Sequence, residues 1–284
     1  MTEPAIPPYT DNAPLPKAPR GTARLVTWNI NSVRLRLPLV EKLVGLARPD
    51  ILCLQETKCP DEAFPVDALK AMGFVHQAFH GMKSYNGVAI LSRVPLAAAN
   101  PRHHCGLEDC RHLAVELPGG IELNDVYIPA GGDEPDPAAN PKFKHKLDFV
   151  ASQAALWKKR KSGKPAILVG DLNIAPFETD VWSHKQLLDV VSHTPVEVEG
   201  LAKMRAAHGW VDVARARYPE PQRLYTWWSY RNSDWRKSDR GRRLDHIWVT
   251  PDLAPKVKGF HILRGARDWT QPSDHVPVAA DIAL

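Results

Sequence analysis

The chain has 284 residues, of which 44% are hydrophobic and 24% are charged. This composition is that of an ordinary globular protein, and it excludes a disordered or fibrous chain; the length suits one large domain or two small ones. The formal charge of +5 and the pI of about 9.0 favour a polyanionic partner only weakly. No apolar run approaches the roughly 18 residues of a membrane-spanning helix, so we expect no membrane association.

The N-terminal segment, residues 1–20, is rich in proline and has neither the apolar core of a signal peptide nor a periodic pattern. We therefore predict a flexible leader over residues 1–20 and a single domain over residues 21–284. No internal linker and no repeat divides the remainder.

The cysteine pattern argues against a disulfide framework. None of the four cysteines belongs to a CxxC pair, and Cys53 lies inside an apolar run. Buried free thiols in a reducing cytoplasm account for them better. The tract HHCGLEDCRH, residues 103–112, lacks a second Cys or His cluster that would complete a tetrahedral site, so it favours a structural zinc ion only weakly.

The domain begins with a predicted β-α-β unit. An alternating strand, RLVTWNINS, ends in Asn29 and Asn31, and leucines and valines at helical spacing follow in RLPLVEKLVGLARPD. The apolar run ILCLQETK predicts a second strand, whose polar end is Glu56. In such a unit Asn29 and Glu56 should lie side by side.

The middle of the chain is more β-like. Short alternating runs, YNGVAILSR, HLAVELP and IELNDVYIP, are typical of stacked antiparallel sheets. An amphipathic helix is predicted over PKFKHKLDFVASQAALWKKRKSG, and the apolar run 166–169 then predicts a buried strand that ends in Asp171 and Asn173. Beyond it we predict a helix around VEGLAKMRAAHGWVD, an aromatic and basic loop, and strands in RRLDHIWVT and SDHVPVAADIAL.

Polar residues recur where these predicted strands end: Asn29, Glu56, Tyr127, Asp171, Asn173, Asp245, Asp274 and His275. A single Asp at such a position is commonly a turn or a helix cap. Several carboxylates and carboxamides with a histidine indicate a hard-cation site beside a proton-transfer group. Oxygen ligands favour Mg²⁺, for which Mn²⁺ should substitute, over zinc; Glu56 is the first-choice ligand, with Asn29 beside it.

This set suits hydrolysis of a phosphate ester, which needs a positioned water, a proton acceptor and stabilisation of the leaving oxygen. Asp171 suits the water, Asn173 can donate to a phosphoryl oxygen, and His275 can contact the phosphate or relay a proton. Asp245 is the best candidate for the carboxylate that orients His275. The tripeptide SDH before a strand also has a plain interpretation as a turn.

Six motifs in chain order, TWNINSVR, LQETK, NDVYIP, GDLN, RRLDHI and SDHVP, resemble those of the exonuclease III family. These are the abasic-site endonucleases of the endonuclease/exonuclease/phosphatase superfamily, and the resemblance extends from Arg24 to Leu284. It implies a four-layer α/β sandwich, in which two mixed β-sheets pack face to face with helices outside. It also implies a monomeric, cytoplasmic DNA-repair enzyme that uses Mg²⁺ to hydrolyse phosphodiesters 5′ to abasic sites in duplex DNA, with 3′ to 5′ exonuclease and 3′-end-cleaning activity.

The resemblance also implies residue roles. Glu56 matches the metal ligand, Tyr127 the catalytic tyrosine near the scissile phosphate, and Asp171 and Asn173 the water-activating and transition-state positions of GDxN. Asp245 matches the carboxylate that supports the histidine. The full predicted metal set is Asn29, Glu56, Asp171, Asn173, Asp274 and His275.

The loop RLYTWWSYRNSDWRKSDRGRR interleaves aromatic with basic residues and so combines stacking surfaces with phosphate-binding charge. Predicted DNA contacts are Trp227, Trp228, Arg231 and Arg242, although Trp228 suits core packing equally. By the resemblance, Trp227 lines the pocket for a base-less sugar. Two departures affect substrate preference: Arg242 stands where some relatives carry an apolar or aromatic residue, and the segment IPAGGDEPDP is acidic.

Two other function classes remain open. A phosphatase or phosphodiesterase of the same superfamily, acting on lipid or small-molecule phosphates, would keep Glu56, GDxN and SDH. A DNA-binding scaffold with an inactive centre would have lost Glu56, Asp171 or His275, and all three are present. The aromatic and basic loop favours the nuclease.

Overall fold

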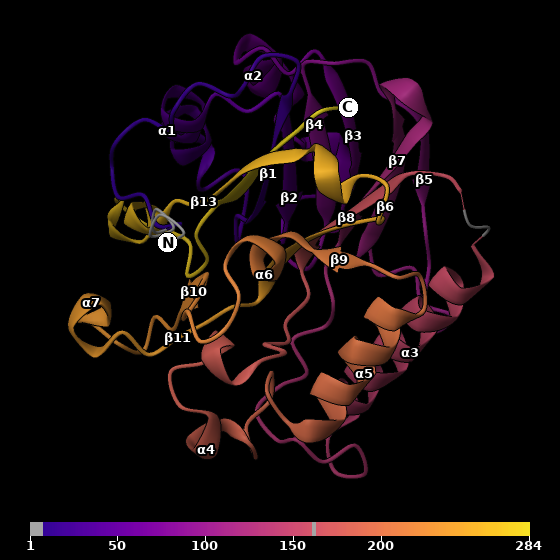
Figure 1. Cartoon of the computed structure of the whole chain (residues 1–284), viewed down its shortest axis with the longest axis vertical. Helices are drawn as coiled ribbons and strands as arrows, with labels where there is room; N and C mark the ends of the chain where they lie inside the picture. Colours follow the sequence, from indigo (N-terminus) through magenta and orange to yellow (C-terminus); the bar gives the residue numbers. More distant parts are fainter. Residues whose placement is uncertain (1–7, 161–162) are drawn as a thin grey trace.

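Two six-stranded β-sheets pack face to face, with helices on their outer surfaces (Figure 1). The computed structural model describes residues 8–160 and 163–284. Helices α1 and α2 cover one sheet, called sheet A here, and α3 and α5 cover the other, sheet B. The predicted four-layer α/β sandwich is therefore confirmed. Within the described residues, no helix combines the length and apolar character needed to cross a membrane.

Sheet A contains the predicted β-α-β unit. In spatial order its strands are β13 (Val257–Ile262), β14 (Val278–Ile282), β1 (Ala23–Asn29), β2 (Ile51–Gln55), β4 (Val88–Ser92) and β3 (His76–His80). Only β1 and β2 run parallel, and α1 (Leu37–Ala47) joins them. Asn29 pairs with Gln55 in this register, so Asn29 and Glu56 meet at one end of the sheet, as predicted.

Sheet B brings together residues that are far apart in the chain. Its strands, in order, are β5 (Ala97–Pro101), β6 (His112–Leu117), β7 (Ile121–Val126), β8 (Ala166–Asp171), β12 (Asp245–Val249) and β9 (Val211–Asp212). Every residue of β8 is buried, because sheet A covers one face and helices cover the other. In the antiparallel register of β8 and β12, Asp171 lies opposite Asp245.

The helices begin and end at recognisable signals. The Asn140 side chain accepts a hydrogen bond from the Lys142 N–H where α3 (Pro141–Lys159) begins. Helix α5 (Pro195–Ala206) begins earlier than the predicted segment, because Thr194 and Glu197 form a capping box ahead of it. The shorter helices are α2 (Val66–Ala71), α4 (His184–Leu187), α6 (Val213–Arg217) and α7 (Trp235–Ser238). Single 3₁₀ turns cover Asp61–Ala63, Pro118–Gly120, Glu178–Asp180, Ala254–Lys256 and Arg264–Asp268.

The aromatic and basic loop contains a two-stranded ribbon of β10 (Trp227–Trp228) and β11 (Gly241–Arg242). The N-terminal segment packs beside it. Tyr9 forms a parallel bridge with Ile262 of β13, and its hydroxyl accepts a hydrogen bond of 2.6 Å from the Tyr225 N–H. Leu15 is only 2% exposed.

Part of the predicted flexible leader instead packs on the domain, because Leu15 is buried and Pro8, Thr10 and Leu15 make backbone hydrogen bonds with Ile262, Gly265 and Leu46. The part of that prediction that concerns residues 1–7 lies outside the described residues. The cysteines need a smaller correction. All four are free, but Cys105 is exposed, whereas we predicted buried thiols.

Candidate active site

The polar residues predicted at strand ends gather where β1, β2 and β8 end and β12 begins. The Asn29 amide nitrogen donates to Glu56 Oε1 at 3.0 Å and to Asp171 Oδ2 at 2.9 Å. Asn29 thus links Glu56, which follows β2 of sheet A, to Asp171 of sheet B. Its side-chain oxygen accepts from the Asn31 N–H at 3.1 Å, so Asn29 is held in place while it orients the two carboxylates.

Glu56 is held as an anion. The Tyr127 hydroxyl donates to its Oε1 at 2.8 Å, and Lys58 Nζ lies 2.7 Å from its Oε2. Burial raises the pKa of Glu56, but the Lys58 charge and the hydrogen bonds from Asn29 and Tyr127 outweigh it and lower the pKa below its usual value. Burial, reinforced by the Glu56 charge, raises the pKa of Tyr127 well above its usual value, so the phenol stays protonated and donates.

The GDLN segment folds tightly around its own aspartate. Asn173 has a positive φ of 51°, and its N–H donates to Asp171 Oδ1 at 2.9 Å while its amide donates to Oδ2 at 3.0 Å. The other amide hydrogen bond of Asn173 goes to Ile128 O at 2.9 Å. A Cβ on Gly170 would lie 1.9 Å from Val126 O, so only glycine fits before Asp171. Burial raises the pKa of Asp171 to about 7, although the nearby His275 charge opposes it.

His275 lies between two carboxylates, as predicted. Its Nδ1 lies 2.9 Å from Asp245 Oδ2 and its Nε2 lies 3.6 Å from Asp171 Oδ2. Burial lowers the pKa of His275, but Asp245 and Asp171 overcome it and raise the pKa to about 10. The side chain is therefore an imidazolium at neutral pH. Thr226 Oγ1, which sequence reasoning missed, donates to the same Asp245 oxygen at 2.6 Å.

Asp274 lies at the edge of this centre. Its Oδ2 accepts from Trp227 Nε1 at 2.9 Å and its Oδ1 accepts from Asn31 Nδ2 at 3.3 Å. Trp227 also forms a backbone bridge with His275. The aromatic ring predicted to contact DNA is thus fixed directly beside the catalytic candidates.

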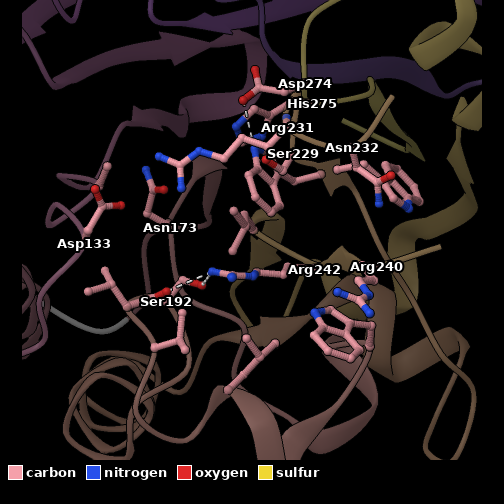
Figure 2. A pocket seen from close by; sticks show the side chains of 18 of the residues that line it. Asp133, Asn173, Ser192, Ser229, Arg231, Asn232, Arg240, Arg242, Asp274 and His275 are labelled. Carbon is pink, nitrogen blue, oxygen red and sulfur yellow. Dashed lines mark hydrogen bonds between the residues drawn. The ribbon is translucent and has the colours of Figure 1, made fainter. Parts of the chain in front are cut away.

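A cavity of about 1130 Å³ opens over the centre and is lined by Glu56, Asn173, His275, Trp227, Arg231 and Arg242 among others. Figure 2 shows the Arg231 side chain extending toward Asn173 and Asp133, and the Arg242 guanidinium directed at Ser192. Trp227, Arg231 and Arg242 therefore face a space that a substrate could enter.

Trp228 does not serve as the predicted DNA contact. Its side chain is 1% exposed, packs against Trp235 with ring centres 5.0 Å apart, and donates from Nε1 to Asp239 Oδ1 at 3.0 Å. Neighbouring residues on a strand point to opposite faces, and Trp228, although it borders the cavity, packs most of its side chain into the core. The core interpretation of Trp228 is the correct one.

The donor set fits a hard cation. Within the described part of the chain, Asp171, Asp245 and His275 form the one group of three whose candidate ligand atoms lie within 4.8 Å of one another. The His275 imidazolium already lies between the two carboxylates of that group. Glu56 is an ionised oxygen donor with a lysine cation beside it. Oxygen donors of this kind suit Mg²⁺ better than zinc.

Comparison with known proteins agrees with the geometry. The sequence model of a family described as the endonuclease/exonuclease/phosphatase family matches residues 26–275. The chain is 29% identical over 270 residues to exodeoxyribonuclease III of Haemophilus influenzae, covering 91% of this chain and 99% of the relative. It is 30% identical over 274 residues to the DNA repair nuclease APEX1 of Danio rerio, covering 92% of this chain and 82% of the relative.

Solved structures with the same fold are also similar in sequence. An AP endonuclease from Archaeoglobus fulgidus superposes with a TM-score of 0.84 at 30% identity, covering 92% of this chain and all (100%) of the other. The 3′ phosphatase NExo from Neisseria, solved with a product DNA hairpin, gives a TM-score of 0.84 at 32% identity, with 92% and 100% coverage.

Proposed function

This chain belongs to the endonuclease/exonuclease/phosphatase family, and within it to the exonuclease III group of DNA-repair nucleases, and from that premise we propose its reaction. It hydrolyses phosphodiesters 5′ to abasic sites in duplex DNA with Mg²⁺, and it also removes nucleotides and blocking groups from 3′ ends. The observation that carries the proposal is the position of Asp171, which contacts Asn29, Asn173 and His275, the last two of which line the cavity.

Asp171 holds the attacking water and accepts its proton. Asn173 keeps the Asp171 carboxylate in one orientation through its N–H and its amide. Both amide hydrogens of Asn173 are directed to Asp171 and Ile128, which favours this orienting role over the predicted contact with a phosphoryl oxygen. A fixed carboxylate lowers the reorganisation needed for proton transfer.

His275 acts on the phosphate, and Tyr127 supports the site. The His275 imidazolium, oriented by Asp245, donates a charge-assisted hydrogen bond to a phosphate oxygen and stabilises the negative charge that develops there. Tyr127 donates its hydroxyl hydrogen to Glu56 and supports the edge of the same site.

Glu56 would be the first ligand of the metal ion, with Asp171, Asn173 and Asp274 as further members of the predicted set, and His275 and Asn29 would support it. When bound, Mg²⁺ supplies positive charge that neutralises the phosphate and its leaving oxygen. Asn29 and Lys58 hold the Glu56 carboxylate in place for this role.

The DNA-binding surface consists of Trp227, Arg231 and Arg242 at the cavity, and arginine side chains there can pair with phosphates. The names of the similar proteins point the same way, because they describe nucleases of DNA and one complex with a DNA hairpin.

The decisive test is cleavage of a labelled duplex with a central abasic analogue, beside an intact blunt duplex. We expect incision 5′ to the lesion. The incision should require Mg²⁺, stop when EDTA is added and return with Mn²⁺. A ladder of products from the intact duplex would report the exonuclease. If neither duplex were cut, the proposal would be wrong, and phosphoinositides and nucleotides would be the next substrates for the phosphatase alternative.

A further inference from the structure

Arg242 occupies an unusual place in the wall of the cavity. In the β10–β11 ribbon it pairs directly with Trp227, so the two side chains project from the same face. The guanidinium lies 5.2 Å from the centre of the Trp227 ring, within the range of a cation–π contact. The indole and the cation therefore form one continuous surface.

The Arg242 guanidinium has hydrogen-bonding capacity to spare. Its Nη1 donates to Val191 O at 2.9 Å and to Ser192 Oγ at 2.7 Å (Figure 2). Nε is buried without a partner, Nη2 donates to no group in the parts of the chain that the structure describes, and no carboxylate there forms an ion pair with Arg242. Because polar groups in such surroundings are normally paired, the free N–H groups of Arg242 indicate a ligand that accepts hydrogen bonds.

The wall that holds Arg242 is rigid. The Ser192 N–H donates to both oxygens of Glu197 at 2.9 Å, and Glu197 pairs with Lys146 at 2.5 Å, with both side chains fully buried at 0% exposure. Lys146 Nζ in turn donates to Asn173 O at 2.8 Å. A chain of buried contacts therefore fixes Arg242 relative to the GDLN segment, which is what a selective contact requires.

Apolar side chains also line the cavity near Arg242. Leu187, Val190 and Leu244 pack together with the Trp227 ring and also line the cavity. Carbon surface beside a hydrogen-bond donor suits a small ring that carries an oxygen substituent, because the ring packs on the carbon while the oxygen accepts the hydrogen bond.

We propose that Arg242 is a specificity-determining residue that donates a hydrogen bond to the oxygen on C1′ of an abasic residue turned out of the duplex. The proposal rests on the proposed function and refines its substrate. A natural abasic residue carries a hydroxyl on C1′, whereas the tetrahydrofuran analogue has only hydrogen there. The analogue would leave the Arg242 N–H groups without an acceptor. A site that offers a buried donor binds a ligand without the matching acceptor more weakly, so the site should discriminate against tetrahydrofuran.

The experiment compares three duplexes with the full chain and Mg²⁺. They carry, at one central position, a natural abasic residue, a borohydride-reduced abasic residue, or tetrahydrofuran. The reduced residue keeps an oxygen on C1′ but cannot undergo β-elimination, so it separates enzymatic incision from spontaneous strand breakage. We expect kcat/KM for both oxygen-bearing residues to exceed that for tetrahydrofuran by about tenfold or more, the effect of one charged hydrogen bond.

Three variants test whether Arg242 causes the preference for residues that carry an oxygen on C1′. Arg242→Leu should lower the ratio of kcat/KM for the oxygen-bearing residues to kcat/KM for tetrahydrofuran to about one. Arg242→Lys should keep part of that preference because lysine is also a hydrogen-bond donor. The matched control is Arg240→Leu, which removes an exposed arginine from the same cavity; Arg240 lies 4.6 Å from the Trp182 ring centre. Arg240→Leu should slow all three duplexes by a common factor and leave the ratio intact.

Two results would overturn the inference while leaving the proposed function in place. One is wild-type protein that incises tetrahydrofuran as fast as the natural residue; the other is Arg242→Leu protein that slows all three duplexes equally. Protein that incises none of the three would overturn the proposed function together with the inference, and that outcome is distinguishable from equal cleavage.

Discussion

Two regions of this molecule bury histidines and treat them in opposite ways. At the active site, His275 contacts Asp245 and Asp171. Beneath α3, His112 of β6 and His104 of the loop before it form what we call the histidine pair, with their ring nitrogens 3.0 Å apart. The partners of the pair are neutral: Ser152, Gln153 and Asn124.

Burial lowers the pKa of a histidine in both regions, because it disfavours the charged ring. For the histidine pair burial prevails, so the pKa of His104 falls to about 4 and that of His112 falls well below its usual value. At His275 two carboxylates reverse the effect and raise the pKa to about 10. Burial alone therefore does not mark a functional histidine; the charge of its partners does.

The largest expected effect comes from removing a carboxylate at the active site. Asp171→Asn should lower kcat by about 1000-fold, because the group that accepts the proton of water is lost. Duplex binding in a gel-shift assay should persist, because Asp171 is 1% exposed and makes little direct surface. His104→Gln is the matched control from the other region and should cleave within about twofold of wild type. Cleavage by Asp171→Asn at the wild-type rate would contradict the mechanism.

A smaller effect tests the charge on His275. Burial lowers the pKa of His275, and Asp245 is one of the carboxylates that raise it. In Asp245→Asn the pKa should therefore fall, and the ring should lose its proton nearer neutral pH. We expect kcat to drop by about 100-fold at pH 8, with the deficit narrowing as the pH is lowered. Single-turnover rates between pH 5.5 and 9 measure this, and a deficit that is constant across the range would show that the imidazolium is not needed.

The histidine pair should govern acid stability instead of catalysis. The unfolded chain takes up a proton at His104 near pH 6.5, whereas the folded chain does so near its pKa of about 4, so stability falls as the pH drops below 6.5. At pH 5 the loss from His104 is on the order of 2 kcal/mol. Urea unfolding at pH 7 and pH 5 should show a smaller loss in His104→Gln. The raised pKa of His275 contributes stability that is fully present below pH 6.5 and is lost only toward pH 10, so it does not mask the effect.

The smallest expected effect comes from giving the histidine pair a carboxylate partner, as His275 has at the active site. Gln153 Nε2 lies 3.1 Å from a ring nitrogen of both His104 and His112, so Gln153→Glu adds a carboxylate to the pair. The pKa values of the ring nitrogens should rise, and between pH 7 and pH 5 the variant should gain about 1 kcal/mol relative to wild type. Gln153→Met is the uncharged control. Parallel losses in the two variants would show that partner charge does not set the difference.

Much of this architecture follows from local sequence. The strands and helices that carry long periodic runs lie where we predicted them, and the motif residues from Asn29 to His275 meet at one end of the sheets. The two-residue strands β9, β10 and β11 were missed, and β9 lies within a segment predicted as a helix. Also missed were β3, β5 and β13, each of which is at an edge of its sheet. Their faces are largely half-buried or exposed, so their sequences show no apolar alternation.

Contacts between distant segments could not be predicted from local patterns. The pairing of Asp171 with Asp245 depends on the register of β8 and β12, and the support of Asp245 by Thr226 depends on the path of a loop. Lys58 did leave a signal, since it lies two residues after Glu56 in LQETK. The packing of Leu15 left none, because a single leucine in a proline-rich segment has no period to detect.

The N-terminal segment has one more consequence, which concerns association between molecules. Ile262 N–H donates to Pro8 O at 2.7 Å and Thr10 N–H donates to Ile262 O at 2.8 Å, so the segment covers part of the outer side of β13. An uncovered edge strand offers such groups to any other extended chain. Strand-to-strand pairing between two copies at this position would first require the segment to leave, so residues 8–10 protect this edge of sheet A.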